Sequence, residues 1–334
     1  MTIKVGINGM GRIGRMIVRS IYENYRNKII IKHINNRSNT EICVSLLKND
    51  SIHGKFNEQI NSGLNFIKIN KNKISYTQHT RIEDIDWKKY GVNYVFECTG
   101  KFNSKNELIR HIKGGVKSVI VSAPCKKADK TVVFGVNQNI LNKDDRIVSA
   151  ASCTTNCLAP VANVINNNFT IKNGFMTTIH AFTSDQRILD NSHKDPRRAR
   201  SANQSIIPTS TGASKTIGEI IPSLKGKLEG VAMRVPIPNV SLVEFVFNVE
   251  KDISVKTIND SFKKASKNKL KNILNITEDK LVSIDFNHNA ASAIIDCSLT
   301  SVISNKMGKI SAWYDNEWGF SNRMCDIAKY LSKI

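Results

Sequence analysis

The chain contains 334 residues, 40% of them hydrophobic and 23% charged, and 49 Lys and Arg against 28 Asp and Glu give a formal net charge of +21. This composition is typical of a globular protein long enough for two domains. No apolar run approaches the roughly 20 residues needed to cross a bilayer, and no signal or transit peptide precedes the first apolar segment, so we expect a cytoplasmic protein.

The N-terminal region predicts a strand over residues 3–8, a helix over residues 12–25 and a second strand over residues 29–34. The first connection is Gly9-Met10-Gly11-Arg12-Ile13-Gly14, a GxGxxG pattern. In a nucleotide-binding βαβ unit the first glycine makes the turn, the second lets backbone approach a pyrophosphate, and the third lets the helix pack on the strand. The alternative is a glycine-rich turn in an α/β fold that binds no nucleotide.

Three more short apolar runs, residues 94–98, 118–122 and 147–150, predict further strands, and a helix ends over residues 110–115. Strands that alternate with helices favour a doubly wound parallel sheet. We therefore expect a Rossmann-type domain over residues 1–152, completed by a C-terminal helix from about residue 316 to 334.

Residues 151–160 read Ala-Ser-Cys-Thr-Thr-Asn-Cys-Leu-Ala-Pro and precede a helix predicted over residues 158–166. Because Ser, Thr and Asn cap helices, Cys153 is expected in a strand-to-helix turn at the positive end of a helix dipole. A thiol there ionises more readily, and the surrounding N–H and hydroxyl groups can bind an anion. The alternative is a small buried cysteine. The seven cysteines form neither a disulfide framework nor a zinc site, and we expect no metal.

The second half of the chain predicts an α+β catalytic domain over residues 153–315. Apolar residues alternate over 174–182, 230–235, 240–247, 293–296 and 309–314, which favours a mostly antiparallel sheet with helices on one face. Helices are predicted over 211–221, 258–265 and 319–331. A polar, basic loop over about 181–208 is long enough to indicate a function.

Seven short motifs occur in a characteristic order: Gly6–Arg15, Ser122–Pro124, Ser152–Cys157, His180-Ala181, Pro208–Ala213, Met233–Pro236 and Trp313–Glu317. Their order and spacing resemble those of the phosphorylating glyceraldehyde-3-phosphate dehydrogenases over essentially the whole chain. The resemblance implies the NAD- or NADP-dependent, reversible oxidative phosphorylation of D-glyceraldehyde 3-phosphate to 1,3-bisphosphoglycerate. It also implies a homotetramer in which the long loop reaches a neighbouring subunit.

The resemblance implies that Cys153 is the nucleophile and that His180 is its base. A Cys153 thioester would form as hydride leaves, and inorganic phosphate would cleave it. An imidazolium at His180 would also stabilise the thiolate. Taken alone, a histidine at the end of a strand is more often structural.

The remaining site residues fall into two sets by resemblance. Those matching phosphate positions are Ser152, Thr154, Thr183, Arg198, Thr211, Gly212 and Arg234. Those matching cofactor positions are Gly9, Gly11, Arg12, Ile13, Gly14, Asn36, Arg37, Ser122, Ser192 and Asn316. Arginine suits phosphate because its guanidinium donates two parallel hydrogen bonds.

Two positions depart from the pattern of NAD-specific relatives. Asn36 stands where an acidic residue usually binds the ribose 2′-OH, with Arg37 beside it, and Asn191-Ser192 replaces a Leu-Pro pair. An Asp would repel a 2′-phosphate, whereas Asn does not. Both departures predict tolerance of NADP; the alternative is neutral drift in an enzyme that uses NAD.

Two other functions stay open at this point. An erythrose-4-phosphate dehydrogenase shares the motif around Cys153, although Thr209–Ala213 fits the triose-phosphate enzyme better. A nucleic-acid-binding protein on the same scaffold would use the net charge of +21, but the basic residues are scattered and lack a recognition module. We therefore expect a small-molecule substrate, a triose phosphate, rather than nucleic acid as the main partner, and no membrane.

Overall fold

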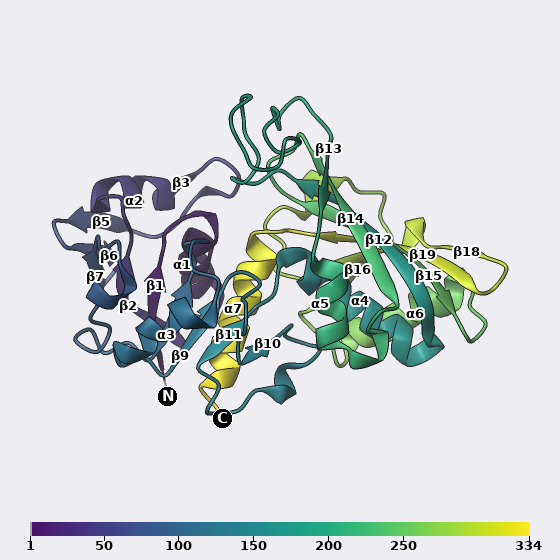
Figure 1. The fold of residues 1–334 in the computed structure, drawn as a ribbon, viewed down its shortest axis with the longest axis horizontal. Helices are drawn as coiled ribbons and strands as arrows, with labels where there is room; N and C mark the ends of the chain where they lie inside the picture. The colour runs from purple at the N-terminus through teal and green to yellow at the C-terminus, as the bar shows by residue number, and fades with distance from the viewer. Residues whose placement is uncertain (1) are drawn as a thin grey trace. The chain divides into compact units, whose positions relative to one another are not determined.

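The computed structural model describes residues 2–334 and divides the chain into two compact units, each built on its own sheet (Figure 1). The first unit comprises Met1–Phe134, Gln138–Ser152 and Ser321–Ile334. The second comprises Gly135–Asn137 and Cys153–Phe320. No helix within residues 2–334 combines the length and the apolarity that crossing a membrane requires.

The first unit contains a nine-stranded sheet in the order β10-β11-β9-β8-β1-β2-β7-β6-β5. Its strands pair in parallel from β10 to β7, and β5 and β6 extend the edge as antiparallel strands. The strands are β1 (Ile3–Asn8), β2 (Ile29–Asn35), β5 (Ile60–Gly63), β6 (Phe66–Ile69), β7 (Asn72–Thr77), β8 (Tyr94–Glu97), β9 (Ser118–Val121), β10 (Lys130–Thr131) and β11 (Ile147–Ser149). A separate ribbon pairs β3 (Asn49–Asp50) with β4 (Gly54–Lys55).

Four helices belong to this sheet's chain segments: α1 (Arg12–Asn24), α2 (Thr40–Lys48), α3 (Lys105–Lys113) and most of α7 (Trp318–Leu331). The α1 helix forms where apolar residues recur at helical spacing, and it buries Met16, Ile17 and Ile21. The α7 helix joins it through Asn322, whose side chain accepts a hydrogen bond of 2.9 Å from Ser20. The C-terminal segment is thereby part of the first unit.

The strand order places β1 between β2 and β8, so the chain leaves the centre of the sheet in opposite directions on either side of β1. In open parallel sheets, ligands bind beyond the carboxyl ends of strands at such a switch point. Asn8, Asn35 and Glu97 end these three strands and are all buried. The fold therefore directs a binding site to the segments that follow them.

The second unit contains an eight-stranded sheet in the order β13-β14-β12-β15-β19-β17-β16, with β18 paired to β19. The β12–β14 and β16–β17 pairs are parallel and the other pairs are antiparallel. The strands are β12 (Ile171–Ala181), β13 (Ile207–Ser210), β14 (Leu228–Val235), β15 (Ser241–Val249), β16 (Leu274–Thr277), β17 (Ala293–Asp296), β18 (Ser301–Ile303) and β19 (Met307–Tyr314).

Three helices lie together on one side of this sheet: α4 (Cys153–Phe169), α5 (Ala213–Ile220) and α6 (Val255–Lys267) (Figure 1). Short 3-10 helices complete the chain: η1 (Ile82–Asp84), η2 (Gln138–Ile140), η3 (Pro222–Leu224), η4 (Ser283–Phe286) and η5 (Cys297–Leu299). The predicted fold class, a Rossmann-type parallel sheet plus an α+β unit with a mostly antiparallel sheet, is confirmed.

The structure corrects the predicted start of the helix after the cysteine motif. The helix begins at Cys153 itself rather than near Leu158. The sharp turn lies just before it, where Ala151 adopts a left-handed φ of +58° although it carries a Cβ. A residue held there is strained, and such strain is common beside functional residues.

Candidate active site

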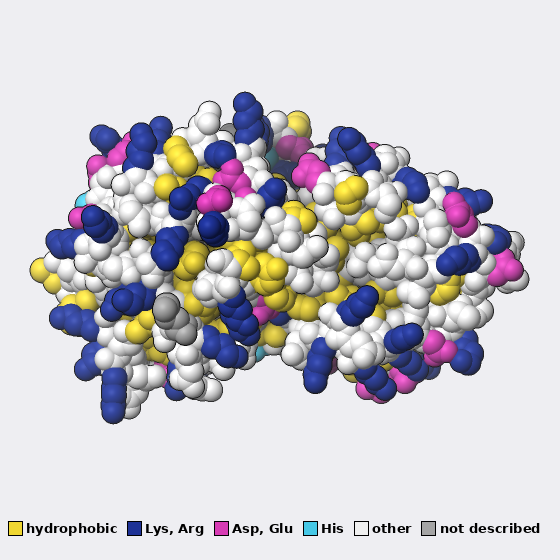
Figure 2. All heavy atoms as spheres, turned by 90° about the horizontal axis from the view of Figure 1, so that it is seen from below, with side chains coloured by type: hydrophobic (Ala, Val, Ile, Leu, Met, Phe, Trp, Pro, Cys, Tyr) yellow, Lys and Arg dark blue, Asp and Glu magenta, His cyan; other side chains and the backbone are white. Residues whose placement is uncertain are grey.

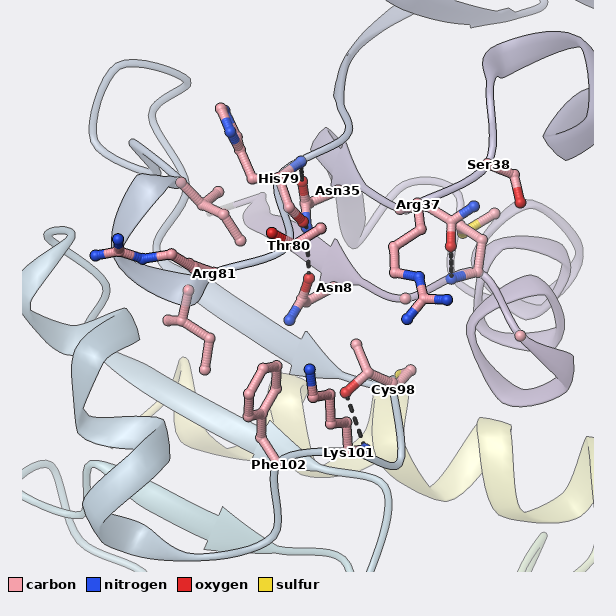
Figure 3. Close-up of a pocket in the computed structure, with 17 residues that line it drawn as sticks. Asn8, Asn35, Arg37, Ser38, His79, Thr80, Arg81, Cys98, Lys101 and Phe102 are labelled. Atoms are coloured by element: carbon pink, nitrogen blue, oxygen red, sulfur yellow. Dashed lines mark hydrogen bonds between the residues drawn. The ribbon is translucent and has the colours of Figure 1, made fainter. Parts of the chain in front are cut away.

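A cavity of about 390 Å³ opens beyond the carboxyl ends of β1, β2 and β8 in the first unit (Figure 3). Four segments line it, each following one of the strands of the parallel sheet: Asn8–Gly11, Asn35–Ser38, His79–Ile82 and parts of Cys98–Phe102, with Ile85 beside them. Apolar Ile82 and Phe102 and several polar groups share this lining, a mixture typical of a nucleotide site.

The three glycines of the GxGxxG loop have different surroundings. A Cβ on Gly9, whose φ is +94°, would lie 2.8 Å from the Thr99 amide nitrogen, and one on Gly14 would lie 2.0 Å from the Gly9 carbonyl oxygen. A Cβ on Gly11 would meet no atom of residues 2–334 within 4 Å. Gly9 and Gly14 therefore allow tight packing, and Gly11 leaves open space at the start of α1. These residues fit a dinucleotide, whose pyrophosphate needs such an approach to a helix N-terminus.

Arg12 is the first residue of α1, but its side chain turns to Asp50 on β3. Its two terminal nitrogens donate to the two Asp50 carboxylate oxygens over 2.5 and 3.0 Å. Burial opposes ionisation of Asp50, yet the hydrogen bonds from Arg12 and from the His53 and Ile52 amides outweigh it and hold its pKa well below the usual range. Asp50 thus fixes the Arg12 side chain at the first turn of α1.

Asn36 is held by its neighbours in the cavity wall. Its Oδ1 accepts from the Met10 amide over 3.1 Å, and its Nδ2 donates to the Tyr76 hydroxyl over 3.2 Å. In Figure 3 the Arg37 guanidinium and the Lys101 ammonium both point into the space between the lining segments. The residues that line the cavity include the cations Arg37, Arg81 and Lys101 and no Asp or Glu.

Lys101 and Phe102 line this cavity but are not among the residues predicted from the sequence. Both residues follow the end of a strand predicted over residues 94–98, and that position at the carboxyl end of a parallel strand is the signal that points to them. Of the other predicted cofactor residues, Ser122 follows β9 at the same sheet edge but does not line the cavity. Ser192 and Asn316 belong to the second unit.

The second unit brings Cys153, His180 and Arg234 together. The Cys153 sulfur lies 3.4 Å from His180 Nε2, and His180 Nδ1 lies 2.7 Å from the Ala181 carbonyl oxygen and 2.6 Å from Arg234 Nη1. His180 is the penultimate residue of β12, Arg234 is the penultimate residue of β14, and the parallel register pairs the two. The start of α4 therefore positions the thiol, and the ends of β12 and β14 position the imidazole and the guanidinium.

The electrostatics of the pair differ from the prediction. Burial raises the pKa of the Cys153 thiol despite the opposing influence of Arg234 and hydrogen bonds from Thr154. Burial and the Arg234 charge lower the pKa of His180 to about 3. The expected acidification of the thiol is therefore wrong in direction, and these shifts favour a thiol beside a neutral imidazole over a thiolate–imidazolium pair. Neutral Nε2 is a proton acceptor placed to activate the thiol as it attacks.

Tyr314 contacts the elements that carry Cys153 and His180. Its hydroxyl lies 2.9 Å from the Thr154 hydroxyl and 2.9 Å from the Thr178 hydroxyl, and its ring meets that of His180 edge-on with centroids 5.9 Å apart. Thr154 neighbours the thiol on α4 and Thr178 lies on the strand of the histidine, so one buried hydroxyl ties both elements together.

Two family models match the chain. The model described as the glyceraldehyde 3-phosphate dehydrogenase NAD binding domain covers residues 3–105, and the model of the C-terminal domain covers residues 152–316. The chain belongs to the glyceraldehyde-3-phosphate dehydrogenase family. It is 46% identical to the glyceraldehyde-3-phosphate dehydrogenase of Cereibacter sphaeroides over the whole of both chains. Identity to that of Geobacillus stearothermophilus is 45%, over 99% of each chain, and to glyceraldehyde-3-phosphate dehydrogenase 2 of Bacillus subtilis 43%, over 99% of this chain and 97% of the relative.

Within this family of oxidoreductases, Arg234 is the best-placed cation for an anionic substrate. The residue is half-buried, and no carboxylate among residues 2–334 lies within ion-pairing distance of it. Its Nη1 donates to the Ala181 carbonyl over 3.0 Å, and its Nε is buried without a partner. A buried, unpaired guanidinium is costly unless an anion compensates it.

The structure distributes the other predicted phosphate residues around this cluster. Arg198 in the long loop forms an ion pair with Asp185 and lies 3.3 Å from Asp195, so carboxylates already neutralise its charge. Thr183 donates through its amide to Gln186 over 3.0 Å. Thr211 and Gly212 precede α5, where the Ala213 amide donates to the Thr211 hydroxyl over 3.2 Å. Ser152 directly precedes Cys153.

Proposed function

We propose that this protein is a phosphorylating glyceraldehyde-3-phosphate dehydrogenase that oxidises D-glyceraldehyde 3-phosphate to 1,3-bisphosphoglycerate with NAD or NADP and inorganic phosphate. The observation that carries the proposal is the contact between a thiol at a helix start and a neutral imidazole, 3.4 Å apart, beside an unpaired, half-buried guanidinium. The reaction is reversible, and serves glycolysis, gluconeogenesis or carbon fixation.

In the proposed mechanism the Cys153 sulfur attacks the aldehyde carbon while His180 Nε2 takes the thiol proton. His180 returns that proton to the carbonyl oxygen, which gives a thiohemiacetal, and then removes it again as the C–H bond breaks. The nicotinamide cofactor, when bound, supplies the hydride acceptor. A phosphate oxygen then attacks the resulting thioester, the C–S bond breaks, and the leaving sulfur recovers the proton held on His180.

Arg234 contributes in this mechanism by compensating the charge of a phosphate group. Its donors point from a desolvated position beside the reacting sulfur, where a charge-assisted hydrogen bond is worth more than in water. Since two phosphates must be accommodated during one turnover, we infer that Ser152, Thr154, Thr183, Arg198, Thr211 and Gly212 provide the remaining donors.

The direct test is a set of initial rates with glyceraldehyde 3-phosphate and NAD or NADP, with inorganic phosphate present and absent. Steady turnover that requires phosphate supports the proposal. A strong preference for erythrose 4-phosphate would favour the alternative enzyme. Figure 2 shows Lys and Arg side chains scattered over one face of the molecule, so no gathered basic patch there favours a nucleic-acid partner.

We infer that the protein assembles as a homotetramer. The long loop exposes three large apolar side chains: Ile188 is 52% exposed, Leu189 74% and Ile206 69%. Exposed apolar side chains in one loop favour a contact with another protein chain. We expect a native mass of about four times 37.3 kDa by mass spectrometry or light scattering. A mass of 37.3 kDa at working concentration would contradict the assembly.

We predict that the cofactor site tolerates NADP. An Asp at position 36 would face the 2′-phosphate as a like charge, and such contacts cost several kcal/mol. Asn36→Asp keeps an acceptor for the Met10 amide but loses the donor to the Tyr76 hydroxyl, whose own proton goes to the Ser38 carbonyl, so circular dichroism accompanies the rates as a check of folding. Arg37→Ala removes a charge-assisted pair worth roughly 1.5–3 kcal/mol. Each variant should lower kcat/KM for NADP about tenfold or more relative to NAD.

Lys28→Ala is the matched control for loss of a cation, since Lys28 is exposed at the opposite end of β2. It should leave the ratio of the two cofactors unchanged. A wild-type preference for NAD of about a thousandfold, with neither Asn36→Asp nor Arg37→Ala shifting it, would show that this strand end does not select the cofactor.

A further inference from the structure

Ser241 connects the strand of the candidate base to the candidate cofactor contact Asn316. It begins β15 and is 1% exposed. The Ala181 amide donates to the Ser241 hydroxyl over 3.1 Å, and that hydroxyl donates to Asn316 Oδ1 over 3.0 Å. The Ala181 carbonyl, in turn, contacts His180 and Arg234. One residue of β12 thereby links to both sides of the site.

The hydrogen-bond chemistry fixes which end of the Asn316 amide faces Ser241. A serine hydroxyl carries one proton, and an oxygen that accepts from a backbone amide is free to give that proton away. The atom that receives it must be the amide oxygen, because the amide nitrogen carries only donors. The Nδ2 group therefore faces the other way, and no group among residues 2–334 accepts a hydrogen bond from it.

The backbone around Asn316 is held independently of Ser241. Asp315 Oδ1 accepts from the Glu317 and Trp318 amides over 2.9 and 2.7 Å. Its Oδ2 accepts from the His288 amide over 2.7 Å and from Asn239 over 2.9 Å. With the backbone fixed on both sides, the freedom that remains to Asn316 is rotation of its amide, which Ser241 controls.

We propose that Ser241 is a positioning residue that locks the Asn316 amide with its N–H donors toward the ligand, so that the site recognises the carbonyl oxygen of the nicotinamide carboxamide. This inference rests on the proposed function, because it takes the cofactor contact that the resemblance implies for Asn316 to be a contact with the nicotinamide ring. The inference predicts a chemical preference. The site recognises the carbonyl group of the nicotinamide ring substituent and does not require the NH2 group of that substituent. A 3-acetylpyridine ring, which keeps the carbonyl and lacks the NH2, should therefore be accepted.

The experiment measures dissociation constants by calorimetry for NAD, 3-acetylpyridine adenine dinucleotide and ADP-ribose. Wild type should bind the two dinucleotides with similar affinity. In Ser241→Ala the Asn316 amide can rotate. NAD keeps a hydrogen bond to Asn316 in either orientation of that amide, because its carboxamide carries both an acceptor and a donor. The analogue keeps its hydrogen bond only when the Nδ2 donors face it. The ratio of analogue to NAD dissociation constants should rise by up to about twofold, because only about half of the amide population then presents its N–H donors. ADP-ribose affinity should not change.

Ser311→Ala is the matched control, because Ser311 is a fully buried serine of the same sheet whose hydroxyl donates to Glu244 instead. It should leave the ratio unchanged. If Ser241→Ala does not fold, Ser241→Cys fills the same space with a weaker donor and should give a smaller rise in the same ratio.

An unchanged ratio in a folded variant that binds NAD would overturn the inference, and so would an equal loss of ADP-ribose affinity, which marks a structural role. Failure of the wild-type protein to bind NAD, NADP and ADP-ribose would overturn the proposed function and this inference with it. The two failures are therefore distinguishable before any turnover is measured.

Discussion

Cys153→Ser should lower turnover by roughly 10⁴-fold or more, the scale reached when the nucleophile of a covalent mechanism is removed. A serine hydroxyl keeps a proton that His180 cannot remove as readily, and alkoxide is a poorer leaving group than thiolate when phosphate attacks. The variant should fold, because Ser is smaller than Cys and Cys153 is the first residue of α4, where serine is tolerated.

Steady-state rates with phosphate, together with circular dichroism and cofactor binding, check this expectation. Cys125→Ser is the control, since Cys125 is the other partly exposed thiol among residues 2–334. Its hydrogen bond goes to a backbone carbonyl rather than to a histidine. Retention of more than about a tenth of wild-type activity in Cys153→Ser would remove the thioester from the mechanism.

The parts of the fold that the sequence predicts best are the ones with strong local signals. The bounds of β1, α1 and β2 fall within one residue of prediction, because GxGxxG marks the turn and buried Ile and Val mark the strands. The antiparallel meander of β5, β6 and β7 and the helix α2 were not predicted. Strand β5 reads Ile60-Asn61-Ser62-Gly63, which has little strand propensity, and its pairing with β6 depends on tertiary contacts.

The sequence also predicts some features of the candidate site and not others. The motifs identify Cys153 and His180, but the 2.6 Å contact between His180 and Arg234 joins residues 54 positions apart through the register of β12 and β14. Sequence patterns do not encode that register. The predicted acidic thiol was wrong for a related reason: the helix N-terminus is visible in the sequence, whereas the burial that raises the pKa of Cys153 depends on the whole fold.

His180→Asn should slow turnover by roughly 10²–10⁴-fold, the usual contribution of a general base. Asn can still donate to a sulfur but cannot accept its proton, so attack must wait for thiolate formed by solvent. That difference makes the pH dependence the sharper measurement. His53→Asn changes a histidine of the first unit that contacts Asp50 through its backbone amide, which the substitution keeps, so it controls for loss of an imidazole and should leave both rate and pH profile unchanged.

The pH profile is read from alkylation of Cys153 by iodoacetamide between pH 5 and 8 (roughly the range in which the protein stays folded). In wild type the pKa of His180 is lowered to about 3, so the base is neutral throughout this range and the rate should vary little with pH. In His180→Asn the rate follows the thiolate fraction, and since burial raises the pKa of Cys153, that fraction grows about tenfold per pH unit over the whole range. The variant should therefore show a slope near one in a plot of log rate against pH, where wild type is nearly flat. Equal slopes in the two proteins, with equal turnover, would mean that His180 only supports the fold, and the proton would need another acceptor.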